Sequence, residues 1–203
     1  MCVLVIVTAH LLDRITWESL RDPRVNDRDW GRMLRSMGYL PVWIVAAFAL
    51  LLHGEPGRRT RQRALFLLLA PALSGLAAEV AKLCFRRLRP DAERFAYVFR
   101  AFTEDPLSTR NLGLPSSHVM VAFGGAFALA WLFPRTRWVW FVLAAGCAAT
   151  RVIALGHFLS DAVTAAVLAW FVVLAVRARL LPHDVDSQSH HPVEQLEQPA
   201  QPV

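Results

Sequence analysis

The sequence predicts an all-α fold: a polytopic membrane helix bundle with five full spans plus a short or truncated N-terminal one. Hydrophobic residues make up 55% of the 203-residue chain, more than a soluble domain usually carries. They occur in blocks close to the length of a membrane span. Several connectors between the blocks contain Arg without any acidic residue, which is typical of cytoplasmic loops. These three observations together favour a membrane bundle.

The N-terminal region is the least regular part of this pattern. Residues 1–12 are apolar apart from His10, and a full span needs about 20 residues. We therefore expect a short or truncated first span in preference to a surface-lying segment. Residues 13–36 mix Arg and acidic residues with Ile15, Trp17 and Leu20. This pattern fits either a helix lying at the membrane interface or a solvated connector.

The remaining blocks predict the five full spans. They cover residues 39–53, 64–84, 118–133, 138–155 and 158–176. The Arg-only connectors lie at 58–63, 135–137 and 177–179. Residues 1–181 are thus predicted to form a single membrane-embedded domain. Residues 182–203 are rich in Pro, Gln and His, and we expect a disordered cytoplasmic tail.

The second full span is followed by a basic segment. Pro90 disfavours helix in the residue before it, so we expect this helix to end near Leu88. Lys82, Arg86 and Arg89 would then share one face. This arrangement fits an interfacial anchor of basic side chains or part of a binding site. Glu79 lies three residues before Lys82 and predicts an internal ion pair.

The extracytoplasmic loop 91–114 has 24 residues, and a loop of that length in a compact domain is usually functional. Phe95, Phe99 and Phe102 within it follow helical spacing. They predict an amphipathic segment at the bilayer surface, which would either gate the approach of a lipid or pack as a cap over the bundle.

Pro115, Ser116, Ser117 and His118 precede the third full span. Ser116 or Ser117 is a natural helix cap, and the free N–H groups of a helix N-terminus bind anions. The alternative is a plain cap beside an interfacial histidine.

A third polar segment stands in the most apolar part of the chain. Arg151, His157 and Asp161 lie there, and an unpaired charge inside a membrane costs at least about 2.5–3.5 kcal/mol. His157 and Asp161 are four residues apart, so on a helix the carboxylate can hold one ring nitrogen and leave the other as a base or nucleophile. Metal sites use this spacing too, but nearby cations would repel a divalent ion. We expect neither metal nor cofactor.

The three polar segments alternate with the Arg-only connectors along the chain, so all three should lie on the side of the membrane opposite the cytoplasm. Lys82, Arg89 and Arg151 could then bind a dianionic group. The two histidines supply a nucleophile and a proton donor, as phosphoryl transfer through a covalent intermediate requires.

These segments are similar to the three-part signature of the type 2 phosphatidic acid phosphatase superfamily. They are Lys82 and, after six residues, Arg89-Pro90; Pro115-Ser116-Ser117-His118; and Arg151, His157 and Asp161 at intervals of five and three residues. The resemblance covers roughly residues 39–176. Ser117 stands where the family usually has Gly, and Thr150 replaces a Ser.

The resemblance implies a role for each matching residue. His157 would be the nucleophile that forms a phosphohistidine, Asp161 its orienting partner, and His118 the general acid and then the base for water. The phosphate would be held by Lys82, Arg89, Ser116, Ser117 and Arg151.

The function expected from this resemblance is a metal-independent phosphatase acting on a lipid phosphate or an isoprenoid diphosphate. It would be a multi-pass protein of the plasma (inner) membrane, with its active site on the extracytoplasmic or periplasmic side. Two alternatives stay open: a lipid phosphotransferase, and a non-catalytic lipid-phosphate binder or transporter. Nucleic-acid binding is not expected, because no basic stripe or known module is present. Cys2, Cys84 and Cys147 lack disulfide or metal spacing.

Overall fold

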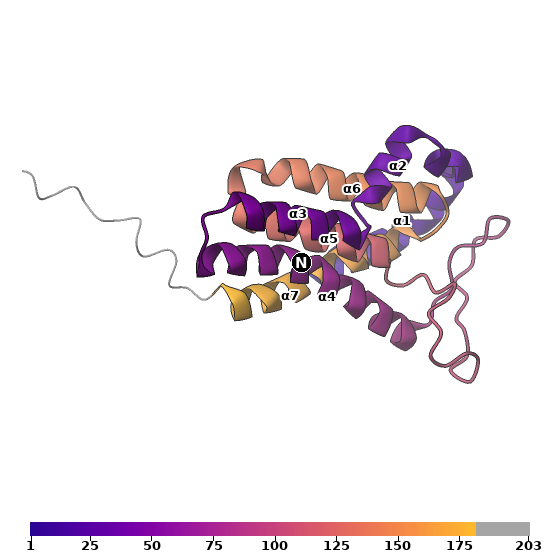
Figure 1. The fold of residues 1–203 in the computed structure, drawn as a ribbon. Helices are drawn as coiled ribbons and strands as arrows, with labels where there is room; N and C mark the ends of the chain where they lie inside the picture. The colour runs from indigo at the N-terminus through magenta and orange to yellow at the C-terminus, as the bar shows by residue number, and fades with distance from the viewer. Residues whose placement is uncertain (182–203) are drawn as a thin grey trace, which may run out of the picture.

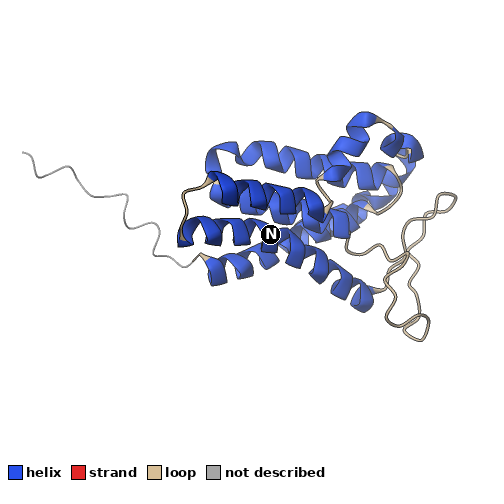
Figure 2. Ribbon diagram, in the orientation of Figure 1, coloured by secondary structure: helices blue, strands red, loops and turns tan. Residues whose placement is uncertain are grey.

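The structure is a computed structural model, and it describes residues 1–181; the predicted tail 182–203 lies outside the described residues. Within them the chain is helical, with long loops and no β-strand (Figure 2). The predicted all-α fold is therefore confirmed. The elements are α1 (Cys2–Ser19), η1 (Pro23–Asp27), α2 (Asp29–Ser36), α3 (Leu40–His53), α4 (Arg58–Phe85), α5 (Ser117–Leu132), η2 (Pro134–Thr136), α6 (Arg137–Ile153) and α7 (Leu159–Leu180).

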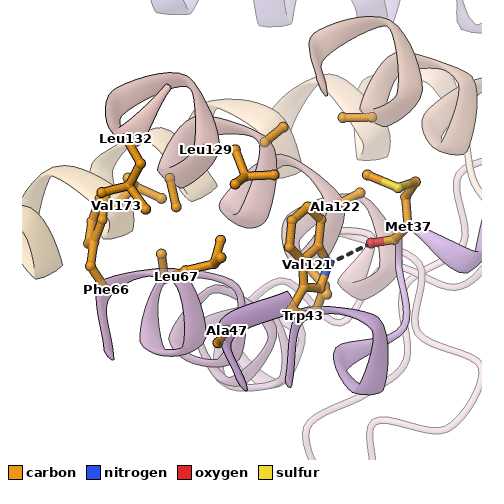
Figure 3. Packing of buried hydrophobic residues seen from close by; sticks show 14 of the residues in the cluster. Met37, Trp43, Ala47, Phe66, Leu67, Val121, Ala122, Leu129, Leu132 and Val173 are labelled. Carbon is orange, nitrogen blue, oxygen red and sulfur yellow. Dashed lines mark hydrogen bonds between the residues drawn. The ribbon is translucent and has the colours of Figure 1, made fainter. Parts of the chain in front are cut away.

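The helices pack around two clusters of buried apolar side chains, and α5, which contributes to both, contacts α4, α6 and α7. Figure 3 shows Phe66 and Leu67 of α4 among side chains from α3, α5 and α7. Close approach depends on small residues, as is common between membrane helices. A Cβ on Gly125 would lie 2.3 Å from the Trp43 ring, so glycine is required where α3 crosses α5. The Trp43 indole donates to the Met37 carbonyl at 2.8 Å.

Two described helices, α4 and α7, are long and apolar enough to cross a membrane, or three if the pair α2 and α3, bent by 63°, counts as one span. This does not confirm the five full spans predicted. The reason is length: α3, α5 and α6 have 14, 16 and 17 residues, below the roughly 20 of a full crossing.

The N-terminal helix differs from its prediction. It runs to Ser19, well past residue 12, and carries exposed apolar side chains on one side, including Val3, Leu4 and Leu11. It is not among the helices that meet the criteria for a span, since its second half contains charged residues. The rest of segment 13–36 forms η1 and α2.

Helix α4 ends earlier than predicted, at Phe85, because Arg86 adopts a left-handed conformation with φ of 54°. Arg86 therefore does not share a face with Lys82 and Arg89. Its buried guanidinium instead donates to backbone carbonyls of the following loop, at 2.8 Å for Ala101 and 3.3 Å for Pro106. Arg86 thus organises the loop and does not belong to a row of cations.

The predicted amphipathic helix around Phe95, Phe99 and Phe102 is wrong. Residues 86–116 form a loop held by backbone pairs: Leu88 N–H donates to the Val98 carbonyl at 2.8 Å, and Gly113 N–H donates to the Arg87 carbonyl at 2.7 Å. These pairs satisfy backbone groups that a helix would otherwise satisfy internally.

The two ends of the bundle differ in chemistry. Figure 1 shows loop 86–116 at the same end as the start of α5 and the turn between α6 and α7. The connectors α3–α4 and α5–α6 and the end of α7 lie at the other end. The three polar segments therefore share one end, and the Arg-only connectors share the opposite end.

Candidate active site

His157 lies in the turn between α6 and α7, and it is 2% exposed. Its Nδ1 is 2.8 Å from the carbonyl oxygen of Gly113. A carbonyl only accepts, so Nδ1 carries the proton and Nε2 keeps a free lone pair. Burial lowers the pKa of His157, as do the charges of Arg151 and Arg89, while Asp161 opposes the shift. The imidazole is therefore neutral near pH 7.

Asp161 is fully buried on the first turn of α7. Its Oδ2 is 3.8 Å from His157 Nδ1, too far for a hydrogen bond, so Gly113 is the ring's direct partner. Asp161 instead accepts from the Phe158 N–H at 2.8 Å and from Arg87 Nε at 3.1 Å. It thus fixes the backbone immediately after His157.

Lys82 reaches the start of α5 from the last turns of α4. Its ammonium forms an ion pair with Glu79 at 2.7 Å and also donates to the Ser117 hydroxyl. The Ser117 hydroxyl donates to Glu79 at 2.5 Å. The predicted Glu79 pair is confirmed, and the side chain of Ser117 points toward α4. The serine found in place of the family's usual glycine therefore has a partner on the neighbouring helix.

Three predicted site residues carry buried polar atoms without a hydrogen-bond partner in the described residues: Ser116 Oγ, His118 Nε2 and Arg151 Nε. Ser116 is fully buried and Arg151 is 6% exposed. A Cβ on Gly156 would lie 2.8 Å from Arg151 Nη2, so the guanidinium rests on the turn that carries His157. Native proteins leave few buried polar groups unpaired without a functional reason. Free donors and acceptors at this place indicate a polar ligand.

Arg89 is exposed and lies in the loop that follows α4. Its N–H donates to the Asn111 carbonyl at 3.0 Å, and its side chain lines a hollow of about 480 Å³ with Pro90 and Arg100. Its charge also acts on His157 and His118. Among residues 1–181 no group of three or more His, Cys, Asp or Glu side chains is placed to hold a metal ion.

Residues outside the predicted segments also reach this site. The break between α2 and α3 brings Tyr39 to His118, with ring centroids 5.2 Å apart, and Arg35 to Tyr39, 5.6 Å from guanidinium carbon to ring centre. Arg35 Nε is buried and has no partner in the described chain. Position 38 must be glycine, because a Cβ there would lie 2.8 Å from the His118 Cβ.

Arg87 was not anticipated either. It is 2% exposed and contacts Asp161, Ser160 and His10, the last at 3.2 Å. The sequence signal was present: Arg87 adjoins Arg86, and His10 is a polar residue in an apolar run. Only the fold shows that Arg87 faces α7 while Arg86 faces the loop.

The fold and site define an α-helical membrane protein with two histidines and a group of cations at one end of its bundle. The PAP2 superfamily model matches residues 63–181, more than half of the chain, and all three polar segments fall within the match. The protein belongs to the PAP2 superfamily, so the resemblance to type 2 phosphatidic acid phosphatases is confirmed. Membership indicates phosphatase activity on phosphate esters. No curated protein and no solved structure matches the chain significantly.

Proposed function

We propose that the protein is a metal-independent phosphatase that hydrolyses a lipid phosphate or lipid diphosphate through a phosphohistidine on His157. The observation that carries this proposal is a neutral His157, whose Nε2 keeps its lone pair, at the bundle end where Ser116 Oγ, His118 Nε2 and Arg151 Nε are buried without a partner among residues 1–181. A phosphate would supply acceptors for the serine and arginine donors, and its leaving oxygen would meet His118.

In the first step, the lone pair of His157 Nε2 attacks phosphorus. The bond from phosphorus to the lipid oxygen breaks with its electron pair on that oxygen, and His118 donates the proton. Lys82, Arg89 and Arg151 offset the charge on the equatorial oxygens, a role that fixed cations can fill by preorganised electrostatics.

In the second step, His118 takes a proton from a water molecule while the oxygen of that water attacks the phosphorus of the phosphohistidine. The N–P bond breaks, its electron pair returns to Nε2, and inorganic phosphate leaves. The carbonyl of Gly113 keeps Nδ1 protonated throughout, which preserves the tautomer that both steps need.

The membrane setting favours a lipid substrate. The bundle end that carries the site borders apolar helices, and exposed apolar side chains cover α1 and α3, including Leu4, Leu11, Val45 and Phe48. We place the protein in the plasma membrane with the site facing the extracytoplasmic side, because the Arg-only connectors lie at the opposite end.

The test is phosphate release by purified protein in detergent with EDTA, over a panel of lipid phosphates and diphosphates. We expect release that survives chelation and falls by at least about 1,000-fold in His157→Ala, in line with the loss of other catalytic nucleophiles. Acid-labile, base-stable labelling by a ³²P substrate would identify the phosphohistidine. His53→Ala, at the opposite end of the bundle, is the matched control. Undiminished release by folded His157→Ala would contradict the mechanism.

Product analysis separates the alternatives within the same panel. A phosphotransferase would move the label to a second lipid and release little inorganic phosphate. A non-catalytic binder would retain lipid binding in His157→Ala and form no labelled protein.

A further inference from the structure

Helix α1 lies outside the matched residues 63–181, yet it places a buried carboxylate beside the candidate catalytic residues. Asp13 is fully buried, although aspartate is rarely buried without strong partners. Its partners lie more than 80 positions away in the sequence. These partners, Ser160 and Tyr97, indicate what the buried carboxylate does.

Asp13 caps α7 from outside that helix. Its Oδ1 accepts from the backbone N–H of Ser160 at 2.8 Å, and its Oδ2 accepts from the Ser160 hydroxyl at 2.5 Å. Ser160 is the second residue of α7, so its N–H has no partner within the helix. The carboxylate also opposes the positive end of the helix dipole. Asp13 thus fixes the turn that carries Asp161.

A third donor completes the coordination of Asp13. The Tyr97 hydroxyl donates to Oδ2 at 2.8 Å. Burial and this hydrogen bond both raise the pKa of Tyr97, so its hydroxyl stays protonated and remains a donor. With three donors the buried carboxylate is well satisfied, which offsets the cost of removing it from water.

The contacts continue from Ser160 through Arg87 to the catalytic pair. Arg87 Nη2 donates to the Ser160 hydroxyl at 2.7 Å, and the same guanidinium pairs with Asp161. The Arg87 carbonyl accepts from the Gly113 N–H at 2.7 Å. Gly113 in turn provides the carbonyl that fixes the tautomer of His157. Arg87 therefore contacts both Asp161 and Gly113, which hold the backbone beside His157 and the tautomer of its ring.

Helix α1 also supplies an acceptor to Arg87 directly, through His10. His10 Nδ1 is 3.0 Å from the Ile6 carbonyl, so Nδ1 donates and Nε2 is free to accept from Arg87 Nη1 at 3.2 Å. His10 and Asp13 are three residues apart and share a helix face. One face of α1 thus supplies His10, which accepts from Arg87, and Asp13, which accepts from Ser160.

We propose that Asp13 is a positioning residue of the active site, which acts through Ser160 and Arg87 to hold Asp161, Gly113 and the reactive tautomer of His157. Helix α1 is accordingly part of the catalytic unit. This inference rests on the proposed function for its kinetic readout, and on the geometry alone for its spectroscopic one.

The experiment compares Asp13→Asn with Glu18→Gln in the full chain. Glu18 lies on the same helix, is half exposed and, among residues 1–181, pairs only with Arg14 at 2.9 Å, so this control removes the same charge away from the network. In Asp13→Asn an amide nitrogen, which cannot accept a hydrogen bond, replaces one carboxylate oxygen. The three donors from Ser160 and Tyr97 then cannot all be satisfied. We expect kcat of Asp13→Asn to fall by about 100-fold, the scale for a misplaced reacting group. KM should change little, because Lys82 and Arg151 remain. Asp13→Glu should recover part of the rate.

The spectroscopic readout is ¹⁵N NMR of histidine-labelled protein, with the His157 signals assigned by His157→Ala. In Asp13→Asn we expect the Nε2 resonance of His157 to move toward a mixture of tautomers, and in Glu18→Gln to stay unchanged. An unchanged His157 spectrum together with unchanged kcat in folded Asp13→Asn would overturn the proposal.

If Asp13→Asn does not fold, Tyr97→Phe replaces it, since it removes one hydroxyl and keeps the ring contacts with Phe158 and Arg87. A several-fold loss of kcat at constant KM supports the proposal, and wild-type kinetics overturn it. If the wild-type protein releases no phosphate, the proposed function fails, and the His157 resonance alone decides the role of Asp13.

Discussion

At the scale of single residues, His157 combines two features of an activated nucleophile. The Gly113 carbonyl selects its tautomer, and burial lowers its pKa. Asp161 contributes less through direct contact with the ring than through the Phe158 backbone and Arg87. A carboxylate 3.8 Å from the imidazole thus contacts the backbone and the arginine that surround the ring.

The lowered pKa makes a testable prediction for titration. An ordinary histidine gains its proton near 6.5, and His157 should gain it at lower pH because its charged form is desolvated. The ring is thus neutral, and competent as a nucleophile, above pH 6.5, and competence is lost as pH falls. A ¹⁵N titration of the His157 ring measures this directly, free from the ionisation of substrate. A midpoint at or above 6.5 would contradict the burial argument.

At the scale of elements, the break between α2 and α3 positions His118. Gly38 lies in this break and packs against His118. A Cβ added at Gly38 would lie 2.8 Å from the His118 Cβ and 2.9 Å from the His118 carbonyl oxygen. A straight helix would carry Tyr39 away from His118. The bend of 63° is therefore part of the site.

Gly38→Ala should disturb the site from this element. The added methyl overlaps His118, and overpacking of this kind costs about 1–3 kcal/mol. We expect a lower melting temperature and a loss of phosphate release. Gly57→Ala is the matched control, because a Cβ there meets nothing within 4 Å. Equal behaviour of the two variants in thermal unfolding and activity would show that the contact is unimportant.

At the scale of the whole molecule, the end opposite the site resembles a membrane interface. Trp131, Trp138 and Trp140 lie there with Arg135 and Arg177, and the Arg177 guanidinium carbon is 3.9 Å from the Trp131 ring centre. Aromatic and basic side chains are enriched at such boundaries, and basic ones on the cytoplasmic side. This asymmetry predicts that the end opposite the site faces the cytoplasm.

A cysteine-accessibility experiment checks that orientation. In a background with Cys2 and Cys84 replaced by Ser, we expect Leu107→Cys to react with an impermeant thiol reagent from outside intact cells. Arg59→Cys should react only after permeabilisation. Both positions are exposed, Leu107 by 86%. Labelling of both cysteines from one side would refute the orientation and the placement of the site.

Much of the site followed from local pattern. Charges that are costly in an apolar segment marked Arg151, His157 and Asp161, and the alternation of connectors placed the three polar segments at one end. Local pattern failed where contacts between distant residues decide the backbone conformation. Phe95, Phe99 and Phe102 have helical spacing, but backbone pairing across the loop overrides it, since spacing says nothing of long-range hydrogen bonds.

What the sequence by itself determined is the fold class, the family and the identity of the polar residues, because burial cost and periodicity act over a few neighbouring positions. The tertiary structure alone decided which of Arg86 and Arg87 contacts Asp161, since one left-handed residue at the end of α4 sends the two side chains to different partners. It also placed Asp13 against Ser160 and Tyr39 against His118. Their contacts join helices distant in sequence, and such pairings depend on packing that no local pattern records.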